Sequence, residues 1–356
     1  MLKEILRYRF CRTDIVVPYL IFFVTSKCNF RCPNCFNIKN LGDGRRDLTL
    51  DEIGRLAPTL GRLLWLSFSG GEPFLRNDLA EIATLLYRHT HFRRFNIPTN
   101  GFLTDRIVEV TQKMLPKIDC DFSVTVSIDG LGDQHDQMKG VPGSFEAATA
   151  TILRLRELQQ RYRHLSVKVN TVISNRNVDT ISVLAEHVRK TLAPDFHAFE
   201  LVRAQPLESP IQPPSIEACA RVYEQVQSIW RLYDQYERNQ SRFVNQLAMG
   251  LYRYLHEVHL ESMSRQVQAV PCLAGKVSGV IYEDGRVGVC EMLPAIGNLR
   301  DVALDFRAIW TSENAERQRH MVRSGGCHCT HTCFQFTSVL FNPRLYGRIL
   351  RSAFSA

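Results

Sequence analysis

Residues 20–35, LIFFVTSKCNFRCPNC, indicate the fold of this chain most clearly. The first part is a short apolar run rich in β-branched and aromatic residues, which is typical of a strand buried on both faces of a parallel sheet. The second part follows at once and places Cys28, Cys32 and Cys35 in a C-x3-C-x2-C spacing. Three thiolates on one loop can bind three irons of a 4Fe–4S cluster. A zinc site would need a fourth close ligand, and this loop offers none.

Similar apolar runs alternate with amphipathic stretches through the first two hundred residues. The runs predict strands at Leu20–Thr25, Leu63–Ser69, Phe95–Pro98, Phe122–Ile128, Val167–Ile173 and Phe196–Val202. The stretches between them predict helices at Leu50–Leu60, Asn77–Arg88, Asp105–Leu115, Phe145–Arg161 and Val178–Leu192. The alternation predicts an α/β fold, a partial (β/α)6 TIM-like barrel whose functional loops follow the carboxyl ends of its strands.

The pattern changes after this region. The stretch Gln205–Ser215 contains four prolines and is typical of a linker, and a helical region of roughly Ile216–Val267 follows it. A turn-rich segment then carries five cysteines, with a β-hairpin predicted around Glu283-Asp284-Gly285. We therefore expect a core at residues 1–203, a linker and helical region at 204–267, a small cysteine-rich domain at 268–340 and a basic amphipathic tail at 341–356.

The composition excludes several protein classes. The 356 residues are 45% hydrophobic and 22% charged, a balance that excludes a largely disordered chain. The net charge of +8 suits an anionic partner, but no RNA-recognition or zinc-finger signature accompanies it, so we do not expect nucleic acid. The eleven cysteines are clumped, and no small-residue cleavage site follows the first apolar run. We expect a cytoplasmic protein whose thiols serve as ligands.

Three motifs follow the cysteine loop, each directly after a predicted strand. They are Ser69-Gly70-Gly71-Glu72-Pro73, Thr99-Asn100-Gly101 and Ser127-Ile128-Asp129-Gly130. Together with the loop, and in this order, they resemble the motifs of the radical S-adenosylmethionine (SAM) superfamily over about residues 21–203. The superfamily usually carries an aromatic residue just before the third cysteine, whereas this sequence has Asn34 there and Phe36 after it.

The resemblance implies a set of cofactor-binding residues. Gly70, Gly71, Glu72 and Pro73 would receive the ammonium of SAM, and Thr99 and Asn100 would contact the cofactor. Ser127 and Asp129 suit the ribose hydroxyls, and Asn170 suits the methionine carboxylate. Since the backbone at Gly71 would approach the ligand closely, a Cβ there is expected to obstruct SAM and to leave the cluster in place.

The resemblance also implies an enzymatic activity, that of a radical SAM oxidoreductase or transformase. Superfamily members pass one electron from the cluster into SAM, which breaks into methionine and a 5′-deoxyadenosyl radical. The radical then abstracts a hydrogen atom from the substrate. Such chemistry needs a low-potential reductant such as a flavodoxin or ferredoxin.

The second group of cysteines resembles the SPASM/twitch extension of the same superfamily. It comprises Cys272, Cys290, Cys327, Cys329 and Cys333. Five thiolates suffice for one fully ligated cluster but not for two, so we expect one auxiliary 4Fe–4S cluster held by Cys272, Cys290 and two of the last three. Alternatives are a structural zinc site on the same cysteines, or a cluster in which His328 or His331 replaces one thiolate.

The sequence is compatible with more than one class of substrate. The extension favours a peptide or protein side chain. No separate peptide-recognition domain is visible in the 27 residues before Cys28, which favours a small biosynthetic or lipid-linked molecule instead. Basic amphipathic ends, Met1–Arg12 and Phe341–Ala356, would suit a lipid or lipid-linked substrate at the inner face of a membrane, unless they form helices docked on the barrel. A non-catalytic protein with zinc in both cysteine groups is the third hypothesis.

Overall fold

The structure is a computed structural model that describes residue 8 and residues 15–203, 210–233 and 241–354. It contains one nine-stranded sheet in the order β6-β5-β4-β3-β2-β1-β7-β8-β9. The six strands of the barrel are parallel: β1 (Tyr19–Thr25), β2 (Trp65–Gly70), β3 (Arg94–Thr99), β4 (Asp121–Ser127), β5 (Leu165–Ile173) and β6 (Phe196–Leu201). The predicted α/β partial barrel is confirmed, with strand bounds close to the expected ones.

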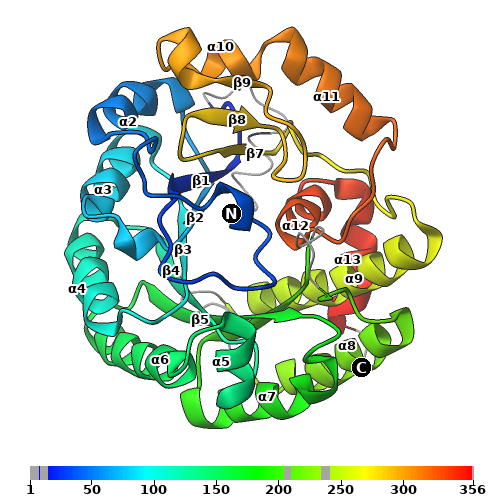
Figure 1. The fold of residues 1–356 in the computed structure, drawn as a ribbon. Coiled ribbons are helices and arrows are strands. Elements are labelled where there is room, and N and C mark those ends of the chain that lie inside the picture. The colour runs from blue at the N-terminus through cyan, green and yellow to red at the C-terminus, as the bar shows by residue number, and fades with distance from the viewer. Residues whose placement is uncertain (1–7, 9–14, 204–209, 234–240, 355–356) are drawn as a thin grey trace.

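Helices cover the outside of this sheet and follow one another around it in Figure 1. They are α2 (Leu50–Leu56), α3 (Leu79–Thr90), α4 (Thr104–Met114), α5 (Asp133–Lys139), α6 (Ser144–Arg161) and α7 (Ile181–His187). The helix α2 begins at a capping box in which Thr49 and Glu52 each bond the other's backbone N–H. All seven residues of β1 are buried, which explains its unbroken apolar sequence. The seven-residue α5 has no sequence period long enough to predict it.

The C-terminal cysteine segment continues the barrel sheet. Its first strand, β7 (Ser278–Ile281), pairs parallel with β1, and the antiparallel strands β8 (Arg286–Gly288) and β9 (Gly297–Asn298) extend the sheet further. The predicted hairpin is therefore confirmed, with Ile281 opposite Val287. The helices α10 (Phe306–Trp310), α11 (Glu313–Arg323) and α12 (Thr332–Leu340) follow.

The helical region predicted at about 216–267 consists of α8 (Ile216–Trp230) and α9 (Arg242–Arg265). The tail forms α13 (Tyr346–Phe354), which packs on α9 so closely that a Cβ on Gly250 would lie 2.5 Å from the Cβ of Ala353. Docking of the C-terminal helix is thus observed, whereas the predicted N-terminal amphipathic segment other than residue 8, and residues 205–209 of the linker, lie outside the described residues. No helix in the described ranges is long and apolar enough to cross a bilayer.

Candidate functional site

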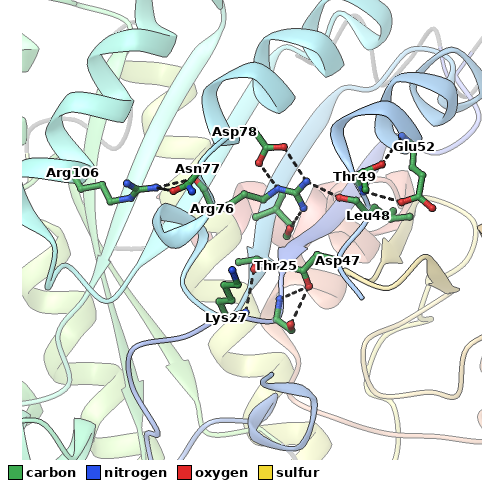
Figure 2. Close-up of polar contacts among 12 residues, drawn as sticks. Thr25, Lys27, Asp47, Leu48, Thr49, Glu52, Arg76, Asn77, Asp78 and Arg106 are labelled. Atoms are coloured by element: carbon green, nitrogen blue, oxygen red, sulfur yellow. Dashed lines mark hydrogen bonds and ion pairs between the residues drawn. The ribbon is translucent and has the colours of Figure 1, made fainter. Parts of the chain in front are cut away.

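The cysteine loop leaves the carboxyl end of β1, where a half-buried acid, Asp47, holds its first residues (Figure 2). Asp47 accepts hydrogen bonds from Thr25 Oγ1 at 2.5 Å and from Ser26 N at 3.0 Å. Thr25 Oγ1 in turn accepts from Lys27 N at 3.1 Å. The path of the chain into Cys28 is therefore fixed by one carboxylate that comes from outside the cysteine motif.

Arg76 ties the same strand end to the next element (Figure 2). Its guanidinium donates to Val24 O at 2.5 Å and to Leu48 O at 2.6 Å, and pairs with Asp78 at 2.8 Å. The side chain is only 9% exposed, so these charge-assisted bonds are shielded from water. Sequence reasoning missed Asp47 and Arg76, because neither belongs to a recognisable motif.

The three loop thiols lie near one another and are not paired in disulfides. Burial raises the pKa of Cys32 to about 11, and the neighbouring Cys35 and Cys28 act in the same direction. Within the described ranges no group of three or more His, Cys, Asp or Glu side chains is arranged to share one metal ion. A donor set of three soft thiols and no harder ligand on one loop fits an iron–sulfur cluster.

The glycine motif packs against the root of the cysteine loop. Gly71 N donates to Thr25 O at 2.8 Å, and Glu72 N donates to Lys27 O at 2.7 Å. A Cβ on Gly71 would lie 2.0 Å from Lys27 O and 3.1 Å from Cys28 Cβ. The close approach that requires glycine is therefore to the chain's own backbone. This differs from the expectation that a Cβ at Gly71 would leave the cluster loop in place.

Glu72 joins the ends of β2 and β3. Its carboxylate accepts from Thr99 Oγ1 at 2.8 Å, from Asn100 N at 2.7 Å and from Phe74 N at 3.2 Å, directly after Pro73. Burial raises the pKa of Glu72 to about 7, against the opposing effect of these three donors. Asn100 Nδ2 also donates to Asn29 Oδ1 in the cysteine loop at 2.8 Å. The predicted residues of both motifs are thus gathered beside the loop, around one buried carboxylate.

A cavity of about 320 Å³ opens from the cysteine loop into the barrel. Asn34 and Phe36 line it at the loop, and Ser127 and Asn170 line it at the ends of β4 and β5. Asn170 Oδ1 is buried and has no hydrogen-bond partner. An unsatisfied buried oxygen costs free energy unless a ligand or water donates to it, so the site is built to receive a polar group.

Asp129 does not line this cavity. Its carboxylate is 0% exposed and accepts from Lys139 Nζ at 2.6 Å and from Val172 N at 2.8 Å. Lys139 is close enough to Cys32 and Cys35 to lower the pKa of both thiols, against the larger effect of burial. The structure thus engages both Asp129 oxygens within the protein, whereas the sequence predicted a ribose contact. The Asp129–Lys139 pair places a buried cation beside two cysteines of the loop.

The Asp129–Lys139 pair has a measurable effect on stability. We expect Lys139→Met to lower the unfolding free energy of the cluster-free protein by about 3 kcal/mol, because it leaves the Asp129 carboxylate buried without its partner. Lys113→Met is the control, since it removes an ion pair of the same 2.6 Å length whose side chains are 59% and 64% exposed. That control should lose far less stability in urea denaturation followed by circular dichroism, because water screens an exposed ion pair. Equal losses for the two variants would contradict the prediction.

The C-terminal cysteines divide into a group of four and one that stands apart. Burial raises the pKa of Cys272 to about 11, and Cys329 and Cys327 raise it further. Cys290 is likewise influenced by Cys329 and Cys272. By contrast, the charged neighbours of Cys333 are Glu200, Arg203 and Glu291, and Cys333 lines the cavity. Cys272, Cys290, Cys327 and Cys329 are therefore the four thiols that influence one another, although the described side chains are not arranged to share one metal ion.

Neither His328 nor His331 is free to replace one of these thiols as a metal ligand. His331 Nε2 contacts Glu291 Oε2 at 2.5 Å, and His328 Nε2 contacts Gln266 Oε1 at 3.0 Å. Burial lowers the pKa of His331, and Arg203 lowers it further, so the imidazole is neutral at pH 7. Both histidines are thus engaged by side chains outside the motif.

Arg203 connects the end of β6 with the C-terminal segment. Its guanidinium donates to Glu200 at 2.6 Å and to Glu291 at 3.0 Å, and lies over the Phe36 ring at 5.2 Å. Glu200, Arg203 and Glu291 all line the cavity. This network could not be predicted from the sequence, because Glu291 lies 88 residues after Arg203 and none of the three residues belongs to a motif.

Comparison with known proteins places the chain in a family. The radical SAM superfamily matches residues 22–188. An AdoMet-dependent heme synthase of Methanosarcina barkeri is 28% identical over 314 residues, which cover 84% of this chain and 83% of that protein. A protein of the same description from Nitratidesulfovibrio vulgaris is 26% identical over 311 residues, covering 83% of this chain and 79% of that protein.

Solved structures share the fold at low sequence identity. Streptococcus suis SuiB bound to S-adenosylmethionine superposes with a TM-score of 0.61 at 14% identity, over 89% of this chain and 70% of that one. The enzyme anSMEcpe with bound AdoMet and a Cp18Cys peptide gives 0.60 at 15% identity, over 94% and 98%. These structures share the fold. Together with the cysteine loop and the ordered motifs at the strand ends, the match over residues 22–188 shows that the chain belongs to the radical SAM superfamily of enzymes.

Proposed function

We propose that the chain holds a 4Fe–4S cluster on Cys28, Cys32 and Cys35 and binds SAM beside it at the ends of β2 to β5. When bound, these groups supply reductive cleavage of SAM to methionine and a 5′-deoxyadenosyl radical, which abstracts a hydrogen atom from the substrate. The observation that supports the proposal most strongly is the single cavity that runs from Asn34 and Phe36 at the loop to the unsatisfied oxygen of Asn170.

The chain's own residues position and shield this chemistry. Glu72 fixes the ends of β2 and β3, while Asp47 and Arg76 fix the start of the loop. Asn170 and Ser127 offer polar atoms to SAM from the cavity wall. The apolar floor of the cavity, which includes Ile21, Phe68 and Phe196, is buried, and it shields this part of the site from water.

We further propose that Cys272, Cys290, Cys327 and Cys329 hold one auxiliary 4Fe–4S cluster that aids electron transfer. Four thiols suit zinc as well as iron, so the metal is the point to be tested. The position of the group supports the redox role, because Glu291, which follows Cys290, faces the cavity.

Loss of one auxiliary ligand should have a local effect. We expect Cys290→Ala to remove the auxiliary iron and to loosen the segment 272–333, because metal binding and folding of such a site are coupled. Cleavage of SAM should survive in part, whereas substrate turnover should fall. Cys219→Ala is the matched control, since Cys219 is a buried free thiol on α8 outside both groups. Iron content and Mössbauer spectra should change only for Cys290→Ala, and zinc in place of iron would overturn the redox role.

The cavity favours a compact substrate group. Since this cavity of about 320 Å³ would also hold SAM, the space beside SAM suits one side chain of a peptide or one group of a small biosynthetic molecule. The likeness to SuiB and anSMEcpe supports the peptide, and the heme synthases support the small molecule. Anaerobic reconstitution with SAM, a flavodoxin or ferredoxin, and candidate pools of each class tests the proposal. Substrate deuterium should appear in 5′-deoxyadenosine, and absence of any SAM cleavage would refute the function.

A second candidate is action on a lipid or lipid-linked substrate at an anionic membrane. It is favoured by an apolar patch formed by Phe243, Leu350 and Phe354, which are 56%, 44% and 52% exposed. The helix α13 in this patch contains arginines and no acidic residue. Apolar side chains set among arginines are typical of surfaces that bind anionic lipid.

The membrane hypothesis makes its own prediction. The full chain should float with vesicles of phosphatidylcholine and phosphatidylglycerol, and high salt should weaken the binding. The double variant Leu350→Ser and Phe354→Ser should stay in the soluble fraction, because it lacks most of the patch. Equal flotation of both proteins would show that the patch is not the membrane contact.

A further inference from the structure

Cys333 lines the cavity, whereas none of the proposed cluster ligands does, although Cys290 shares its neighbour Glu291 and Cys329 shares its neighbour Arg203. It begins the first turn of α12, four residues after Cys329, and its side chain lines the cavity. Its charged neighbours are Glu200, Arg203 and Glu291, not the other cysteines. The auxiliary group already has four thiols without it, so Cys333 is left over for another role.

A second observation indicates that a ligand sits at this wall of the cavity. Thr332 also lines the cavity, is only 7% exposed, and its hydroxyl oxygen has no hydrogen-bond partner. A buried hydroxyl without a partner is costly, and a substrate group can supply the missing bond. Cys333 therefore faces a place where a polar substrate can be held.

The Cys333 sulfur is also near the cysteine loop and remains protonated. Arg203 NH2 is 3.9 Å from Cys333 Sγ, and the same guanidinium lies 5.2 Å from the centre of the Phe36 ring, next to Cys35. The Arg203 guanidinium therefore contacts both the Phe36 ring and the Cys333 sulfur. Burial raises the pKa of Cys333 to about 12, with Glu200 adding to the effect, so at neutral pH the group is S–H. The buried Tyr19 hydroxyl is hydrogen-bonded to it.

We propose that the Cys333 thiol donates a hydrogen atom to a carbon radical formed in the cavity. The inference rests on the proposed function, which supplies the radical. An S–H bond is weaker than an aliphatic C–H bond, so the transfer is downhill. Cys333 would then complete a reaction in which the substrate exchanges one hydrogen atom for another.

The transfer balances in two steps. In the first, the S–H bond of Cys333 breaks, a C–H bond forms at the radical carbon, and the unpaired electron moves to sulfur. In the second, the thiyl radical takes one electron from the low-potential donor that SAM cleavage also requires, and one proton from solvent, which restores the thiol. The substrate undergoes no net oxidation over these steps.

The test uses SAM itself as the probe, because it needs no natural substrate. The reconstituted full chain is reduced with titanium(III) citrate in D2O, without added thiols, and 5′-deoxyadenosine is examined by mass spectrometry. In D2O the Cys333 thiol carries deuterium, whereas carbon-bound hydrogens do not exchange. We expect the wild type to form monodeuterated 5′-deoxyadenosine and Cys333→Ser to lose this label while still cleaving SAM. Cys219→Ala, which alters a buried thiol outside the cavity, should keep the label.

Two further measurements separate the outcomes. Iron counting on the Cys28, Cys32 and Cys35 triple alanine variant should give the same auxiliary iron with and without Cys333→Ser. Loss of that iron would show that Cys333 is a ligand and would overturn the inference. Retention of the label in Cys333→Ser, or its loss only in Tyr19→Phe, would also overturn it. No 5′-deoxyadenosine from the wild type would instead refute the proposed function.

Discussion

Replacing Cys28, Cys32 and Cys35 together by alanine is expected to abolish 5′-deoxyadenosine formation and to remove about four irons from the reconstituted protein. The three thiols are the only soft donors on the loop that leaves β1, so no other side chain there can take their place. The iron of the C-terminal group should be unaffected, because its four thiols come from other elements. Iron analysis and chromatography of the SAM products measure the two effects.

The matched control for the triple variant changes cysteines that neither group uses. Cys120 and Cys219 are buried free thiols, and their double alanine variant should keep both the iron and SAM cleavage. SAM cleavage by the triple variant at the wild-type rate would refute the assignment of the loop.

We expect Gly71→Ala to reduce the amount of cluster bound by Cys28, Cys32 and Cys35. A single methyl group at this position would lie 2.0 Å from Lys27 O, which real Cβ atoms do not tolerate, so the root of the cysteine loop must move. The hydrogen bond from Glu72 N to Lys27 O would be strained by the same shift. We therefore expect less iron at the three-cysteine site as well as weaker SAM binding, measured by iron analysis and isothermal titration.

Gly42→Ala provides a control in the same neighbourhood. A Cβ on Gly42 would meet Ser26 Oγ at 3.4 Å, which is close to ordinary contact, although Gly42 N also bonds Ser26 O. This variant should retain its iron. If Gly71→Ala kept full iron and lost only SAM affinity, the original sequence expectation would be right, and the packing at Lys27 would be less rigid than the structure indicates.

The fold was predictable because its signals are local. Each barrel strand carries its own apolar run, and the cysteine and glycine motifs follow their strands directly, so both order and position could be read from the sequence. Asp129 shows the limit of that reasoning. A polar residue at a strand end can contact either a ligand or the protein, depending on its neighbours. Here Lys139 forms an ion pair with Asp129, and Lys139 lies on the short helix α5, which no sequence pattern predicts.

The choice among the last three cysteines could not be made from sequence for a related reason. Cys327, Cys329 and Cys333 are a few residues apart, and spacing alone does not say which way each side chain points. The start of α12 turns Cys333 toward Tyr19 and Arg203, which arrive from β1 and from the end of β6. Contacts between elements that are far apart along the chain produce no periodic pattern in the sequence.

The pairing of β7 with β1 has a consequence for biosynthesis. Tyr19 lies opposite Ser278, so one edge of the first strand stays open until more than two thirds of the polypeptide has been made. At ribosomal speeds of about 5–20 residues per second, that interval is on the order of ten seconds or more. An uncovered edge of apolar backbone invites pairing with other chains. Nascent or prematurely terminated products ending before residue 278 should therefore depend on chaperones, and expression of the barrel alone should yield insoluble protein.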